Sequence, residues 1–128
     1  MLILITALLV AQQAMAEPEQ TEIVVIGQRL SHWSGKYAIR GSKLRCSTKT
    51  SSGDRDIDDL GCRAFDACAD QLAPQIAATD EKSLSREVRL TMKESVKRDL
   101  SACVADKRVI LIQELAKQRQ DVPGEKSN

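Results

Sequence analysis

Residues 61–77, GCRAFDACADQLAPQIA, decide the fold because they combine a helical pattern with two of the four cysteines. Apolar side chains and cysteines recur there at helical spacing and form one stripe, made of Cys62, Phe65, Cys68, Ala69, Leu72 and Ile76. Pro74 interrupts the pattern, because a proline inside a helix removes a backbone donor and clashes with the preceding turn. We therefore expect the regular helix to end near Ala73.

An acidic run precedes this helix. Asp54, Asp56 and Asp58 alternate as in the start of a calcium-binding loop. Such a loop needs Gly at its sixth position and Glu at its twelfth, where this chain has Asp59 and Phe65. We interpret the run as the capped, acidic start of a helix, where negative charge is favourable. The sequence predicts no metal site and no cofactor.

A second helical pattern follows Thr79-Asp80-Glu81, which is a typical helix start. Its apolar residues recur every four positions, at Leu84, Val88, Met92, Val96 and Leu100. This spacing turns the stripe gradually around the helix, so the helix either crosses its neighbours diagonally or breaks. Cys103 falls in the middle of the stripe and is expected to face the core. The pattern allows one long helix or two consecutive ones.

Before the first predicted helix, apolar and polar residues alternate over short stretches, which predicts strands. Residues 37–40 and 43–46 flank Gly41-Ser42, a pair suited to a two-residue hairpin turn. The β-branched run at residues 23–26 is expected to be a third strand. The predicted fold class is α+β, with a short antiparallel sheet in the β-rich residues 22–49 and two or three helices in residues 58–117.

The amino terminus predicts export. Residues 2–10 are apolar except for Thr6, and Ala14-Met15-Ala16 follows, as in a secretory signal peptide. No Lys or Arg precedes the apolar run, and the alternative is an uncleaved anchor or a buried first helix. We expect a signal peptide at residues 1–16, one small domain at 17–117 and a flexible polar tail at 118–128. No transmembrane span remains after cleavage, since no other apolar stretch is long enough.

Four cysteines in an exported chain predict two disulfides that staple the small domain. Sequence alone does not choose among the three possible pairings. If the two helices fold back on each other, Cys62 and Cys103 lie at similar distances from the connection. This geometry favours Cys62–Cys103, which leaves Cys46 to pair with Cys68.

No catalytic set is recognisable. His32 is the only histidine, and its neighbours Ser31 and Ser34 do not form a triad merely by adjacency. The chain has 19 basic and 18 acidic residues, so a nucleic-acid partner is not expected. We predict no catalytic residues.

Residues 22–29, EIVVIGQR, resemble the TonB box of TonB-dependent outer-membrane receptors. The family commonly has Glu, Ile, Val, Val, Thr, Gly, a variable residue and Arg, and this chain departs from that pattern at Ile26. The receptor's plug and barrel are absent. In the family the segment pairs with the edge of a partner's sheet, so the resemblance implies partner binding through Ile23, Val24, Val25, Ile26 and Gly27. The alternative is an ordinary strand of the protein's own sheet.

The whole chain also resembles small exported proteins of Gram-negative bacteria that have no assigned activity. This resemblance implies where the protein is located but does not indicate an activity. Together these features predict a non-enzymatic, soluble periplasmic or secreted protein that binds an unidentified protein partner. The alternative is a small exported enzyme or an enzyme inhibitor. A carboxylate beside His32 would favour an enzyme, and a rigid exposed loop at residues 47–53 would favour an inhibitor.

Overall fold

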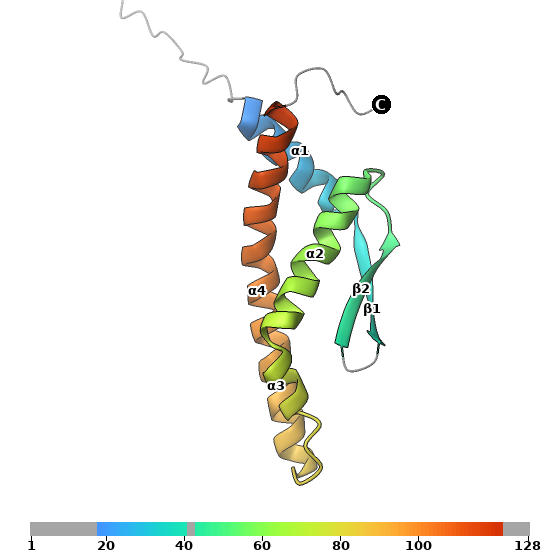
Figure 1. The fold of residues 1–128 in the computed structure, drawn as a ribbon, viewed down its shortest axis with the longest axis vertical. Coiled ribbons are helices and arrows are strands. Elements are labelled where there is room, and N and C mark those ends of the chain that lie inside the picture. Colours follow the sequence, from blue (N-terminus) through green and yellow to red (C-terminus); the bar gives the residue numbers. More distant parts are fainter. Residues whose placement is uncertain (1–17, 41–42, 122–128) are drawn as a thin grey trace, which may run out of the picture.

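A computed structural model describes residues 18–40 and 43–121 of the 128-residue chain. The elements, in chain order, are α1 (Pro18–Leu30), β1 (Ser34–Arg40), β2 (Lys43–Thr50), α2 (Arg55–Gln71), α3 (Ala73–Ala78) and α4 (Arg86–Asp121). Helices α2 and α3 run antiparallel to the long α4, α1 crosses the carboxyl-terminal part of α4, and the two strands lie against α2 (Figure 1). The signal peptide expected at residues 1–16, the Gly41-Ser42 turn and residues 122–128 of the expected tail lie outside the described residues.

The predicted α+β class is confirmed, because a two-stranded antiparallel sheet is combined with helices and two disulfides. The sheet does not begin the fold, however, since α1 precedes it. The expected strand at residues 23–26 is wrong: these residues lie within α1, so residues 22–30 of the segment expected to be β-rich are helical. Ile23, Ile26 and Leu30 recur at helical spacing, and packing on α4 outweighs the β preference of the branched residues.

The hairpin has the expected register. Tyr37 pairs with Cys46 and Ile39 with Leu44. The ring of Tyr37 stacks on Phe65 of α2, with ring centroids 4.0 Å apart. An isolated two-stranded sheet is only marginally stable, so this contact and the disulfide from β2 to α2 supply the support it needs.

Helix α2 begins after the predicted acidic cap and ends close to the predicted position. Asp54 is the N-cap, and its carboxylate accepts hydrogen bonds from the backbone N–H groups of Asp56 and Ile57. The helix ends at Gln71, two residues before the expected position. Pro74 then lies in the first turn of α3, where its missing N–H group leaves no hydrogen bond unmade.

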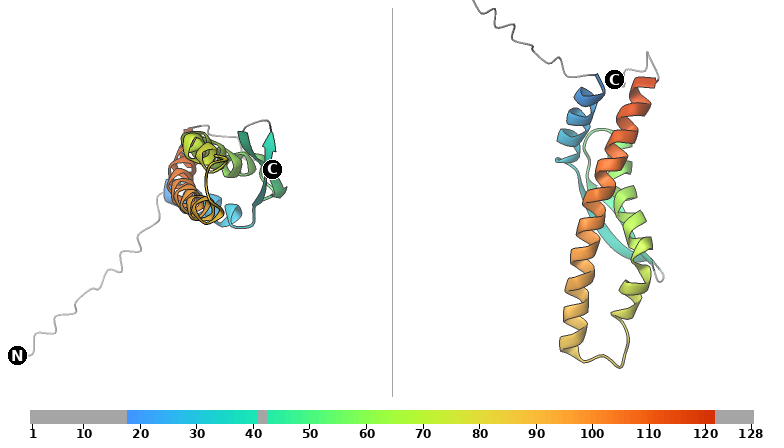
Figure 2. Two further views of the ribbon diagram at one scale, coloured as in Figure 1. Left: turned by 90° about the horizontal axis from the view of Figure 1, so that it is seen from below. Right: turned by 90° about the vertical axis from the view of Figure 1, so that its left-hand side faces the viewer.

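The core lies where α1, α2 and α4 meet. Its fully or nearly buried members are Ile26, Leu30, Trp33, Ile57, Leu60, Ala64, Leu111 and Ala116. All of them come from the half of the molecule that contains α1 and the carboxyl-terminal part of α4. Toward the opposite end, α4 is accompanied only by the end of α2 and by α3 (Figure 2).

Helix α4 is one continuous helix of 36 residues. Only Leu111 and Ala116 are buried in it, while Met92, Val96, Leu100 and Cys103 are half-buried. Val88, expected in the apolar stripe, is 47% exposed. Residues 118–121, expected to belong to a flexible tail, form the last turn of this helix. None of the described helices is both long enough and apolar enough to cross a membrane.

Candidate functional site

Two disulfides fix α2 to a different neighbour on each side. Cys46–Cys62 joins β2 to α2, and Cys68–Cys103 joins α2 to α4. Cys62 and Cys68 are six residues apart, so they point in directions about 120° apart around the helix. The hairpin, α2 and α4 are therefore covalently connected in series.

This connectivity corrects the expected pairing of Cys62 with Cys103 and of Cys46 with Cys68. The expectation assumed that the chain reverses midway between two helices of matching length. Residues 79–85 instead continue beyond the end of α3 before α4 begins, so α4 starts farther along the molecule than α3 ends (Figure 2). Cys103 consequently lies beside Cys68 rather than beside Cys62.

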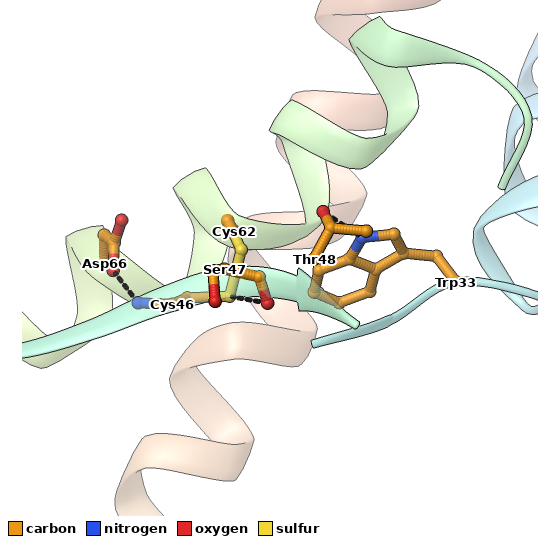
Figure 3. The surroundings of a disulfide bond; sticks show 6 residues. All are labelled: Trp33, Cys46, Ser47, Thr48, Cys62 and Asp66. Carbon is orange, nitrogen blue, oxygen red and sulfur yellow. Dashed lines mark hydrogen bonds between the residues drawn. A yellow bond between two sulfur atoms is a disulfide. The ribbon is translucent and has the colours of Figure 1, made fainter. Parts of the chain in front are cut away.

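Trp33 packs beside the Cys46–Cys62 bridge (Figure 3). Its indole Nε1 donates a hydrogen bond to the Thr48 hydroxyl at 3.0 Å. The Arg108 guanidinium of α4 lies 5.6 Å from the ring centroid. Close by, the backbone N–H of Cys46 donates to the Asp66 carboxylate at 3.0 Å. These contacts hold the hairpin, α2 and α4 in one rigid arrangement.

Arg119 connects α4 to the acidic start of α2. It donates to the Asp54 carboxylate at 2.6 Å, and its guanidinium lies 3.9 Å from Asp56 and 4.0 Å from Glu22 of α1. Burial alone raises the pKa of Asp54. The hydrogen bond and charge of Arg119, with the two backbone N–H groups, outweigh burial and hold this pKa below the usual 3.8. The acidic run therefore serves to cap and anchor α2, and no three potential ligand side chains gather to hold a metal within residues 18–40 and 43–121.

A shallow pocket of about 160 Å³ lies between α2 and α4. Pockets that enclose organic ligands usually have volumes of about 300–1,000 Å³. The apolar part of the pocket is formed by Leu60, Leu111 and Leu115. The charged part is formed by Asp56, Asp59, Arg63 and Glu114. Its small volume does not support enclosure of an ordinary organic substrate.

His32 and residues 47–53, on which the enzyme and inhibitor alternatives depend, lie at the start and at the end of the hairpin, respectively. His32 is exposed in the turn between α1 and β1, and in the described part of the chain no carboxylate pairs with its imidazole. Residues 47–50 of the expected inhibitory loop belong to β2. In the remaining short connection, the Asp58 carboxylate of α2 accepts hydrogen bonds from both Ser51 and Ser52, which fixes this connection to the start of the helix.

The segment expected to bind a partner is divided between core and surface. Ile26 is completely buried, and Ile23 packs against the core. Val24 is 57% exposed, and Val25 is also exposed on α1. The helix therefore exposes two of the five expected binding residues and buries or packs two others against the core.

Sequence reasoning overlooked a second exposed apolar pair. Val109 and Ile110 of α4 are about half-exposed, although they directly precede the buried Leu111. Helices α1 and α4 pack together, so both exposed pairs belong to one two-helix unit. The sequence indicates this exposure, because the apolar run from Val109 to Ile112 covers more than one face of a helix and only one face can be buried.

Comparisons with protein-family models, curated proteins and solved structures find no match to this chain.

Proposed function

We propose that this is a non-enzymatic protein of an oxidising compartment, periplasmic or secreted, that binds another protein through the outer surface of α1 and α4. The observation that carries the proposal is the exposure of adjacent aliphatic pairs on these two packed helices, Val24 with Val25 and Val109 with Ile110. Exposed apolar side chains mark interaction surfaces where they form a contiguous patch, so the proposal requires a partner that contacts both helices.

The disulfides support a rigid binding module. They persist in oxidising compartments, and both crosslinks here involve α2. A preformed surface loses little conformational entropy on binding, which favours affinity. The cysteines therefore contribute to binding indirectly, by holding α4 and the hairpin against α2.

The mode of binding that fits the helical state of α1 is helix packing, in which the partner covers the exposed valines. Strand addition by residues 23–27 would require α1 to unfold and Ile26 to leave the core. Burial of Ile26 stabilises the fold by about 1.5–3 kcal/mol. Strand addition would lose this stabilisation, whereas helix packing keeps it.

The test uses two matched double variants of the mature protein. Val24→Glu/Val109→Glu places charges on the proposed surface, and Val88→Glu/Leu90→Glu places the same charges near the start of α4, on comparably exposed residues. After crosslinking in the cell envelope, the first variant should lose the partner that the unmodified protein captures, and the second should keep it. Equal capture by both variants, or equal loss, would contradict the proposed surface.

The compartment has a separate test. The intact mass of protein from the envelope or medium should lack residues 1–16, and its four cysteines should resist alkylation until a reductant is added. A mass that begins at Met1 together with four reactive thiols would refute export, whatever the binding experiment gives.

A further inference from the structure

The hairpin carries charge of one sign only. Residues 34–50 include five basic residues and no Asp or Glu, although the whole chain is nearly neutral. The five are Lys36, Arg40, Lys43, Arg45 and Lys49. The compensating acidic residues are concentrated elsewhere, notably in α2. The near-zero net charge therefore conceals a strongly basic element.

The strand register places part of this charge on the face that points away from α2. Tyr37 and its partner Cys46 face α2, because they contact Phe65 and Cys62. Side chains alternate along a strand, and paired residues share a face. Lys36, paired with Ser47, and Arg45, paired with Ala38, consequently lie on the opposite, outer face.

Three of the four described basic side chains of the hairpin form no ion pair within the described residues. Arg45 reaches back to Asp70, with a nitrogen–oxygen distance of 3.2 Å. Lys36, Lys43 and Lys49 are exposed, and none of them forms an ion pair with a carboxylate of the described residues. From Lys43 to Lys49 the strand extends about 20 Å, so the charges are spread along a line rather than gathered around a point.

We propose that this outer face binds the phosphate headgroups of an anionic lipid bilayer. Spread lysines match a plane of many phosphates better than they match one small anion. The outer face offers no described aromatic ring on which a nucleic-acid base could stack, since Tyr37 stacks on Phe65. It also offers no large apolar residue for insertion, so binding is peripheral and weakens as salt screens the charges. This site is separate from the α1–α4 surface and does not depend on it.

The test is co-sedimentation of the mature protein with vesicles of phosphatidylglycerol and phosphatidylcholine, compared with phosphatidylcholine alone. Each lysine near an anionic surface strengthens binding by about fivefold. Lys36→Gln/Lys43→Gln/Lys49→Gln should therefore weaken binding to the anionic vesicles by on the order of 100-fold. The matched control is Lys93→Gln/Lys97→Gln/Lys117→Gln, which removes three exposed lysines from α4 and so has the same net charge as the hairpin variant.

The control should retain binding within a few-fold, and circular dichroism of both variants should match that of the unmodified protein. Equal weakening by both variants would overturn the proposal, because net charge rather than the hairpin would then decide binding. Absence of binding to anionic vesicles at low salt would also overturn it. So would tighter binding of the hairpin face to a DNA oligonucleotide than to the vesicles.

Discussion

The indole ring of Trp33 lies against the backbone of Gly61, so that a Cβ atom added at Gly61 would be only 2.7 Å from ring atom Cε2. Gly61 is buried in α2, and Trp33 leads into β1. A Cβ atom added at Gly35 of β1 would likewise lie 2.7 Å from the ring, so the absence of side chains at both glycines allows Trp33 to pack between the hairpin and α2, beside the Cys46–Cys62 bridge.

Gly61→Ala should destabilise the protein by about 1–3 kcal/mol, because the buried ring has to shift. Gly27→Ala is the matched control: Gly27 also lies in a helix, but nothing lies within 4 Å of its added Cβ. It should stabilise the fold by about 0.5–1 kcal/mol through higher helix propensity. Urea unfolding followed by Trp33 fluorescence measures both, and the same sign of change in both variants would contradict the close packing.

The two disulfides should contribute unequally. Cys46 and Cys62 are 16 residues apart, whereas Cys68 and Cys103 are 35 apart. By the chain-entropy relation, replacing the first pair with alanines should cost about 3 kcal/mol and replacing the second about 4 kcal/mol. Denaturant unfolding of the two double variants gives these costs. Non-reducing peptide mapping should recover only these two linkages, and a linked peptide pair containing Cys62 and Cys103 would disprove the connectivity.

The ion pair between Asp54 and Arg119 predicts a specific acid sensitivity. The folded-state pKa of Asp54 lies below its usual value of 3.8. The ionised Asp54 carboxylate therefore stabilises the fold at pH values above 3.8. This stabilisation is lost as the pH falls through the lower, folded-state pKa. Arg119→Gln should cost about 1–2 kcal/mol near neutral pH and reduce the fall in stability on acidification.

Lys117→Gln provides the control for this prediction, since it removes an exposed positive charge within one helical turn of Arg119. Melting temperatures measured from neutral pH to below 3.8 should show an unchanged acid response for the control. An acid response of Arg119→Gln equal to that of the unmodified protein would show that the pair does not set the pKa of Asp54.

Proline substitutions distinguish a helix from an extended peptide at residues 23–27. Val24→Pro/Val25→Pro should destabilise the protein by about 3 kcal/mol or more, because both positions lie inside α1 and each proline breaks a helical hydrogen bond. Thermal unfolding measures the change. A melting temperature equal to that of the unmodified protein would mean that the segment is not a structural helix, and would restore strand addition as the mode of binding.

Local sequence patterns predict the hairpin and α2 well, because their determinants are local. Alternation at Tyr37 and Cys46 defines one face of the strands, and Asp54 provides an N-cap whose partners are the next residues along the chain. The break near Pro74 follows from the chemistry of proline alone. Such features do not depend on where the rest of the chain lies.

Features that depend on tertiary packing are not predictable in this way. The β-branched residues of α1 favour a strand locally, and the packing of Ile23, Ile26 and Leu30 on the core makes the helix preferable. The cysteine pairing depends on how far residues 79–85 run before the chain reverses, which no local pattern encodes. The basic hairpin could have been found from residues 34–50, but averaging charge over the whole chain concealed it.

Binding of a protein partner through α1 and α4 can be measured by site-specific photocrosslinking in intact cells. A photoreactive amino acid is placed singly at Val24, at Val109 and, as a control, at Leu90, all of which are about equally exposed. We expect the same crosslinked protein species from Val24 and Val109 and none of that species from Leu90. No crosslinked protein from either of the first two positions, or the same species from all three, would contradict it.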